Sequence, residues 1–210
     1  MLQQTRVETV IPYYLRFLEK FPTVEALALA EPGEVIKAWE NLGYYTRARN
    51  LQKAAREITD RFGGRIPADR EEILRLPGIG RYTAGAILSI AFGRPVPAVD
   101  GNVRRVISRL CVMDEPADDH GVQERIEALV QAMIPIRNPG RFNQALMELG
   151  AVCCTPRNPS CPSCPLQTDC RARKQGLTDR LPVRRERKAI PHREVVAAIL
   201  LNGKKRVLIV

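Results

Sequence analysis

Aromatic residues and long apolar runs are both scarce in this chain. Phe, Trp and Tyr make up 5% of its 210 residues, so aliphatic side chains must fill the core that a 45% apolar composition can bury. No run of 18 apolar residues is present, which excludes a transmembrane helix. The N-terminus also lacks the charged and then apolar pattern of a secretory signal. We therefore expect one large or two small domains in the cytoplasm.

Positive charge is in excess but unevenly placed. The formal net charge is +10, which favours a polyanionic partner. Residues 183–210 hold eight Lys/Arg and two Asp/Glu, whereas residues 1–182 hold 25 and 21. Net charge is therefore weak evidence for nucleic-acid binding, and local motifs must decide the question.

The periodicity of apolar residues predicts an all-α body up to residue 182. Helices are expected at about 2–18, 23–30, 32–43, 44–62, 70–76, 84–92, 103–110, 126–134 and 142–149, with no strand among them. Thr23 is placed to cap the second helix. Leu51, Ala54, Ala55, Ile58 and Phe62 are expected to face inward from the 44–62 helix. Its basic residues suit either a solvated face or nucleic acid.

The sequence pattern changes after residue 182. A basic linker at 182–193 is followed by two apolar runs that Asn202-Gly203 separates. Asn-Gly favours a tight β-hairpin turn, and two strands cannot form a stable unit alone. Residues 194–210 are therefore expected to begin a second, β-containing domain.

Residues 76–84 combine a glycine-rich turn with the start of a helix. Gly78 and Gly80 leave backbone amides uncovered, and such amides at a helix N-terminus bind phosphate. Ile79 is expected to anchor the turn in the core. The alternative is a simple corner between two helices. Asp100 begins the next long helix, where it is either an ordinary N-cap or a functional carboxylate.

Four cysteines occur within 17 residues, in the pattern Cys154-x6-Cys161-x2-Cys164-x5-Cys170. Without a secretion signal, a metal site is favoured over disulfides. A compact loop with one close pair fits an iron–sulfur cluster better than zinc, although neither rule is strict. Cys111 and Cys153 fall outside the pattern and are expected to be small buried core residues.

The hairpin, helix, loop and Val-Asp-Gly-Asn-Val segment together resemble the helix-hairpin-helix (endonuclease III-like) DNA glycosylases. The resemblance implies base flipping from duplex DNA, cleavage of the N-glycosidic bond, and no stable oligomer. It gives Asp100 the role of stabilising the sugar cation, with Asn102 holding the site. It also implies a [4Fe–4S] cluster on Cys154, Cys161, Cys164 and Cys170, with Arg157 near a phosphate.

Two further segments resemble the MutY-type adenine glycosylases within that superfamily. They are Met-Leu-Gln-Gln-Thr at 1–5 and Leu-Gly-Tyr-Tyr-x-Arg-Ala-Arg-Asn-Leu at 42–51. The resemblance places Gln4, Tyr44, Tyr82 and Gln144 near the mismatch or the flipped adenine, and extends the DNA contacts to Arg47, Gly78 and Gly80. Bifunctional relatives carry a lysine at position 82. Tyr82 therefore implies a monofunctional enzyme that borohydride does not trap on DNA.

The resemblance also implies a domain division and a chain truncated at both ends. The glycosylase body would span 1–152 with its hairpin at 76–84, the cluster segment 153–181, the linker 182–193, and a Nudix-like domain would begin at 194–210. The partner is double-stranded DNA containing adenine opposite 8-oxoguanine or guanine. Alternatives are a thymine glycosylase for T·G mismatches and a non-catalytic iron–sulfur DNA-binding protein.

The glutamate that protonates adenine in this family would lie two residues before Met1. Three interpretations follow: a partial sequence of a normal enzyme, a truncated form that binds DNA without cleaving it, or a remnant that folds poorly. Because a general acid commonly supplies about a hundredfold or more in rate, we expect little adenine excision by the purified 210-residue chain. Robust excision from an A·8-oxoguanine duplex would contradict this expectation.

Overall fold

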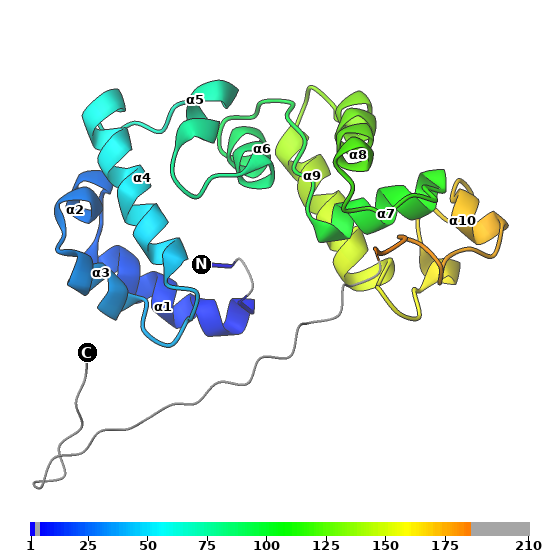
Figure 1. Cartoon of the computed structure of the whole chain (residues 1–210), viewed down its shortest axis with the longest axis horizontal. Coiled ribbons are helices and arrows are strands. Elements are labelled where there is room, and N and C mark those ends of the chain that lie inside the picture. The colour runs from blue at the N-terminus through cyan, green and yellow to red at the C-terminus, as the bar shows by residue number, and fades with distance from the viewer. Residues whose placement is uncertain (3–4, 186–210) are drawn as a thin grey trace, which may run out of the picture.

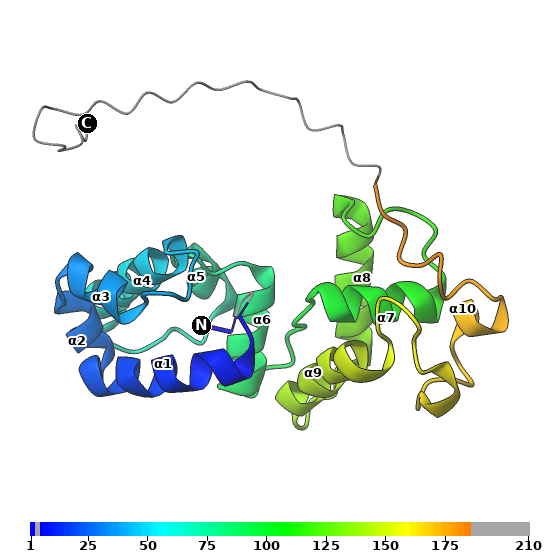
Figure 2. The same ribbon diagram turned by 90° about the horizontal axis from the view of Figure 1, so that it is seen from below.

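The computed structural model describes residues 1–2 and 5–185, and within them the chain forms two helical lobes (Figure 1). The first lobe contains α1 to α6 and the second contains α7 to α10 (Figure 2). The helices are α1 (Val7–Lys20), α2 (Val24–Leu29), α3 (Pro32–Ala38), α4 (Thr46–Phe62), α5 (Arg70–Arg75), α6 (Arg81–Ile90), α7 (Gly101–Cys111), α8 (His120–Met133), α9 (Pro139–Glu148) and α10 (Arg171–Lys174). Two short turns, η1 (Leu149–Cys153) and η2 (Cys161–Ser163), carry cysteines.

The expected all-α body is confirmed for the described residues, which contain a single isolated β-bridge between Pro116 and Val183 and no longer strand pairing. No helix in this part of the chain is both long and apolar enough to cross a membrane. The expected linker beyond residue 185 and the hairpin at 194–210 lie outside the described residues.

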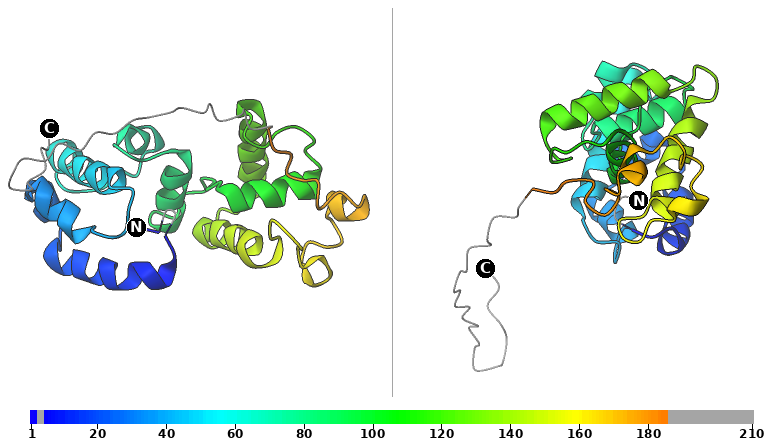
Figure 3. Two further views of the ribbon diagram at one scale, coloured as in Figure 1. Left: turned by 60° about the horizontal axis from the view of Figure 1, so that its bottom comes forward. Right: turned by 90° about the vertical axis from the view of Figure 1, so that its right-hand side faces the viewer.

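Three apolar clusters form the cores of the lobes, two in the first lobe and one in the second. The first joins α1 to α4 around Trp39, and the second joins α4, α5 and α6 around Ile73. The third joins α7, α8 and α9 around Ile107 and includes Cys154 at its edge. Helices α6 and α9 pack together where the lobes meet, as the further views in Figure 3 also show. The loop from α6 to α7 crosses the same junction.

Thr23 caps α2 as predicted, because its side chain accepts a hydrogen bond from the Ala26 amide. The expected helix at 32–43 was too long, since α3 ends at Ala38. Asn41, Gly43 and Tyr44 take left-handed backbone conformations with φ of 68°, 67° and 47°. The Trp39 indole N–H donates to the Gly43 carbonyl at 3.2 Å. This turn delays α4 until Thr46.

The prediction that Leu51 faces inward was wrong, because its side chain is 40% exposed. Ala54, Ala55 and Ile58 are buried as predicted, and Ala48 and Gln52 are buried beside them. Gln52 can be buried because its amide donates to the carbonyls of Leu27 and Ala30 at 3.3 and 2.6 Å. The small alanines let α2 and α3 approach α4 closely, so burial follows these polar and packing constraints rather than side-chain hydrophobicity alone.

The N-terminus of α8 is tied to the end of the described chain. The Asp119 carboxylate accepts a hydrogen bond from the Gly121 amide at 3.0 Å and one from Arg185 at 2.7 Å. The Gly121 amide is the main cause that holds the pKa of Asp119 below its ordinary value of 3.8, and Arg185 adds to it. A carboxylate with a lowered folded-state pKa stabilises the fold above its unfolded pKa, and this contribution disappears as pH falls through the folded value.

We therefore expect D119A to lower the melting temperature at neutral pH, because the cap and the contact with Arg185 are both lost. The difference from wild type should shrink below about pH 3.8, where protonation removes the same interactions from the wild-type chain. Thermal melts followed by circular dichroism at several pH values measure this. D118A is the matched control, since Asp118 contacts Arg185 at 3.7 Å without capping the helix. An equal shift in both variants would refute the capping role.

Candidate active site and cysteine pocket

The Leu76–Gly80 turn joins α5 to α6 and is anchored as predicted. Leu76 is buried, and Ile79 packs against the cluster formed by α4, α5 and α6. Gly78 has φ of 79°, and a Cβ there would approach the Cβ of Asn50 at 2.7 Å. Gly80 does not need this freedom, since its φ is −95°. Gly80 is the N-cap of α6 and provides no side-chain cap, and a Cβ at Gly80 would meet no atom within 4 Å.

Asp100 is the N-cap of α7, and both of its carboxylate oxygens are engaged. One oxygen accepts the Val103 amide at 2.8 Å, and the other accepts the Asn102 side-chain amide at 3.0 Å. The expected N-cap role of Asp100 is therefore confirmed. The side chain is half-buried rather than exposed. Because it sits at the positive end of the helix, its negative charge is favoured there.

Arg105 connects this acid to the cysteine segment. Its guanidinium donates to Asn102 Oδ1 and to the Gly150 carbonyl, both at 2.7 Å, and its Nε donates to the Cys154 carbonyl at 2.7 Å. Burial lowers the pKa of Arg105, an effect that the nearby Cys154 opposes. A Cβ on Gly150 would lie 2.6 Å from the Cβ of Asn102, so η1 packs directly on the first turn of α7.

Tyr82, in the first turn of α6, interacts electrostatically with the same acid. Burial raises the pKa of its hydroxyl, and the negative charge of Asp100 raises it further. The hydroxyl donates to the Met147 sulfur at 3.6 Å. Gln144 lies three residues before Met147 on α9, which places the two on one side of that helix, and its side chain is exposed. The structure thus brings Asp100, Asn102 and Tyr82 together, with Gln144 on the neighbouring helix.

Tyr44 and Arg47 form a separate group at the start of α4. The Tyr44 ring is 67% exposed, on a backbone with positive φ. The Arg47 guanidinium lies over the rings of Tyr44 and Trp39 and donates to the carbonyls of Met1 and Leu42 at 2.9 and 3.2 Å. Arg47 is therefore half-buried and bonded to the protein. Gln4 lies outside the described residues.

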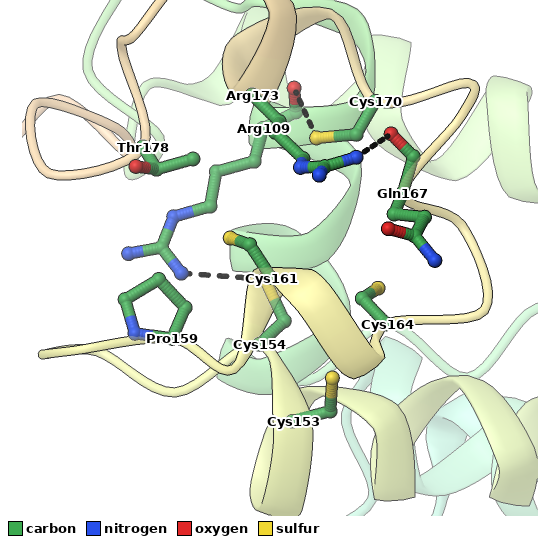
Figure 4. A pocket seen from close by; sticks show the side chains of 10 residues that line it. All are labelled: Arg109, Cys153, Cys154, Pro159, Cys161, Cys164, Gln167, Cys170, Arg173 and Thr178. Atoms are coloured by element: carbon green, nitrogen blue, oxygen red, sulfur yellow. Dashed lines mark hydrogen bonds between the residues drawn. The ribbon is translucent and has the colours of Figure 1, made fainter.

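All four predicted cluster ligands line one pocket in the second lobe (Figure 4). Cys154 follows η1, Cys161 opens η2, Cys164 follows η2, and Cys170 precedes α10. Space not filled by atoms, part of it open to solvent, amounts to about 300 Å³ there. Burial and then the neighbouring cysteines raise the pKa of Cys161. In the described residues, no three His, Cys, Asp or Glu side chains are close enough to ligate a single metal ion.

Arg109 is the positively charged wall of this pocket. It is 2% exposed, and its Nη1 lies 3.2 Å from the Cys154 sulfur and 2.8 Å from the Thr155 carbonyl. Its Nε donates to the Leu181 carbonyl at 2.9 Å. Four gathered thiols beside a buried guanidinium provide soft, anionic ligands with a hydrogen-bond donor, which suits an iron–sulfur cluster. Arg157 is exposed on the loop after Cys154.

No sequence pattern singled out Arg105, Arg109 or Asn143. Asn143 is fully buried in α9, accepts the Ala98 amide at 3.2 Å, and donates to Ser89 Oγ and the Val96 carbonyl at 2.9 Å each. It thereby fixes the loop that leads to Asp100. In the sequence, Asn143 could be noticed only as a polar residue beside Phe142 on an otherwise apolar helix face. For Arg105 and Arg109, the sequence offered only their spacing of four residues along α7.

Comparison with known proteins places this geometry in context. The sequence profile of the HhH-GPD superfamily of base excision DNA repair proteins matches residues 1–132. The chain is 47% identical over 182 residues to the adenine DNA glycosylase of Homo sapiens, covering 86% of this chain and 33% of that protein. It is 37% identical to the corresponding protein of Buchnera aphidicola from Schizaphis graminum, covering 90% and 55%. It thus spans a third to about half of these relatives.

Solved structures agree with the sequence comparison. A thermostable thymine-DNA glycosylase superposes with a TM-score of 0.75 at 30% identity, covering 83% of this chain and 80% of that one. A trapped covalent intermediate of endonuclease III with DNA superposes with a TM-score of 0.71 at 34% identity, with the same coverage. The profile match over more than half of the residues, together with these shared folds, shows that the chain belongs to the HhH-GPD superfamily of base excision DNA repair proteins.

Proposed function

We propose that the chain is the helical glycosylase part of an adenine DNA glycosylase that removes adenine opposite 8-oxoguanine or guanine. The observation that carries the proposal is the Asp100–Asn102 pair at the start of α7, facing Tyr82 of α6. Identity of 36–47% to adenine DNA glycosylases supports the choice of base. The division at residues 152, 181 and 193 into body, cluster segment and linker is part of the same proposal.

Asp100 would act on the sugar rather than on the base. Cleavage of an N-glycosidic bond passes through a cation that resembles an oxocarbenium ion. A fixed carboxylate near that cation stabilises it without having to reorganise. The bonds from Val103 and Asn102 hold the Asp100 oxygens in place before the reaction starts. The target base must first leave the stack, since chemistry inside a duplex is sterically blocked.

Tyr82 supports hydrolysis by water. A lyase step needs an amine near the sugar to form a Schiff base. Tyr82 is neutral at physiological pH, because burial and Asp100 raise its pKa, and its hydroxyl is directed to Met147. Tyr82 therefore favours a monofunctional glycosylase, which cleaves the bond between base and sugar with water and has no lyase step.

The proposed DNA contacts come from several elements. The amides of Gly78 and Gly80 would bind a backbone phosphate, whereas the Ile79 amide between them already donates to the Leu76 carbonyl at 3.2 Å. Exposed Arg157 would contact another phosphate. Tyr44, exposed on a strained turn, would enter the duplex together with Gln4. Exposed Gln144 on α9 would lie near the flipped adenine. Arg47 would act in support, because its hydrogen bonds hold the turn that carries Tyr44. The partner is a double-stranded mismatch bound by a monomer.

A [4Fe–4S] cluster on Cys154, Cys161, Cys164 and Cys170 completes the proposal. Their shared pocket and the Arg109 contact to Cys154 support it. When bound, the cluster would fasten the loops between η1 and α10 to the second lobe. The protein itself already holds the Cys154 carbonyl, through the hydrogen bond from Arg105 Nε at 2.7 Å.

Thymine excision from T·G mismatches is the second candidate, since the solved thymine-DNA glycosylase shares the fold at a TM-score of 0.75. A single-turnover assay on matched A·8-oxoguanine and T·G duplexes, run long enough to detect slow excision, separates the two. Release of adenine alone supports the proposal. Release of thymine alone would replace the proposed substrate, and DNA binding without release of either base would favour the non-catalytic alternative.

The role of Asp100 predicts a charge-specific binding defect. D100N keeps a side chain that can cap α7 but removes the negative charge. We expect it to bind a duplex carrying a cationic pyrrolidine in place of the target sugar about tenfold or more weakly than wild type. Affinity for the same duplex with neutral tetrahydrofuran should change little. Fluorescence anisotropy at constant salt gives both dissociation constants.

D60N is the control for this measurement, because Asp60 is an exposed carboxylate at the far end of α4. It should leave both affinities unchanged. If D100N weakens the cationic and neutral duplexes equally, Asp100 shapes the protein and does not stabilise positive charge on the sugar.

The cluster proposal predicts iron content that depends on the pocket cysteines. After anaerobic reconstitution with ferrous iron and sulfide, wild type should bind iron and acid-labile sulfide, and C170A should lose both. C111A should behave like wild type, since Cys111 lies in a different groove beside Val112 and Leu129. Iron, sulfide and visible absorbance are measured together. Zinc in place of iron, or full loading of C170A, would rule out the proposed cluster.

A further inference from the structure

The cysteine pocket contains one more cysteine than the proposed ligand set. Cys153 lines the pocket together with Cys154, Cys161, Cys164 and Cys170 (Figure 4). The prediction that Cys153 is a small buried core residue is therefore wrong. Its side chain is half-buried, at the end of η1, and its sulfur is directed into the pocket toward Cys164.

The orientation of Cys153 relates it to Cys164, because its sulfur points toward that cysteine across the pocket (Figure 4). The Cys153 sulfur also lies 3.5 Å from the Ser160 carbonyl, on the loop that leads to η2. This carbonyl contact is weak for a thiol, so the Cys153 sulfur is not fixed as the Cys154 sulfur is by Arg109.

Cys154 differs from Cys153 in how it is held. The Cys154 sulfur is fixed by Arg109, and the Cys154 carbonyl by Arg105. Because the two cysteines are adjacent in sequence, the arginines that fix Cys154 also keep Cys153 beside the pocket. Cys154 is thus anchored at the Arg109 wall, whereas Cys153 approaches from the side of Cys164.

We propose that Cys153 is a reserve ligand that takes the place of Cys164 when Cys164 is lost. The inference rests on the proposed cluster. In the exchange the Cys153 thiol gives its proton to solvent, and its thiolate forms a bond to the iron that Cys164 no longer occupies. No electron is transferred, and the number of thiolate ligands stays the same. Soft thiolate donors are the ligands that such a cluster prefers.

The test compares loss of Cys164 with loss of Cys170 in the whole 210-residue chain. Wild type, C153A, C164A, C170A and C153A/C164A are reconstituted anaerobically with ferrous iron and sulfide. We expect C153A and C164A to hold iron and sulfide close to the wild-type level. C170A and the double variant should hold almost none. The double variant keeps only three pocket thiols, and C170A keeps four but has no thiol to replace Cys170, since Cys153 points toward Cys164.

A second measurement identifies the ligand. The reconstituted proteins are treated with iodoacetamide, and the modified cysteines are located by mass spectrometry. Cys153 should be alkylated in loaded wild type and protected in loaded C164A, while Cys111 reacts equally in both. If C164A binds no more iron than C170A, whether folded or not, the proposal is overturned. Alkylation of Cys153 in loaded C164A overturns it equally. Failure of wild type itself to load would instead overturn the cluster, and the reserve ligand with it.

Discussion

The position of the Asp100 carboxylate depends on the hydrogen bonds that the planar guanidinium of Arg105 donates. A guanidinium donates in fixed directions, so its bonds to Asn102 Oδ1 and to the carbonyls of Gly150 and Cys154 constrain three segments at once. Asn102 passes this constraint on to Asp100 through its own amide. A half-buried charge that lost these partners would be costly. The start of α7 and the cysteine loop therefore keep one common geometry, although they have different proposed tasks.

Two other features reinforce the same junction. Gly150 lets η1 approach the first turn of α7 so closely that any side chain there would collide with Asn102. One turn further along α7, Arg109 bonds to the Thr155 and Leu181 carbonyls and so joins the beginning and end of the cysteine segment. On the opposite side, Asn143 holds the loop that precedes Asp100. The acid is thus positioned by polar bonds to backbone from both flanks.

Much of this architecture could be predicted from the sequence, for identifiable reasons. Helical periodicity, the Thr23 cap and the Leu76–Gly80 turn are local patterns, and each appears in the structure. The turn at 39–45 could not be predicted, because its left-handed residues depend on Trp39 and Arg47 bonding to its carbonyls. The prediction that Leu51 is buried was wrong for a related reason. Gln52 takes the buried position because its side-chain amide donates to the carbonyls of Leu27 in α2 and of Ala30 just after it. Arg105, Arg109 and Asn143 have partners some 45 residues or more away, and such partners leave no local signal.

The turn that carries Tyr44 has a consequence for recognition. A non-glycine residue with a left-handed backbone costs on the order of 1 kcal/mol or more, and Tyr44 adopts this conformation with its ring largely exposed. The surrounding bonds of Arg47 and Trp39 offset that cost within the folded protein. The backbone that carries the ring is consequently fixed before any partner arrives, so association does not have to include the ordering entropy of this turn. With the DNA-binding role proposed for Tyr44, substitutions that loosen Arg47 would weaken affinity indirectly, by returning conformational freedom to the turn that carries Tyr44.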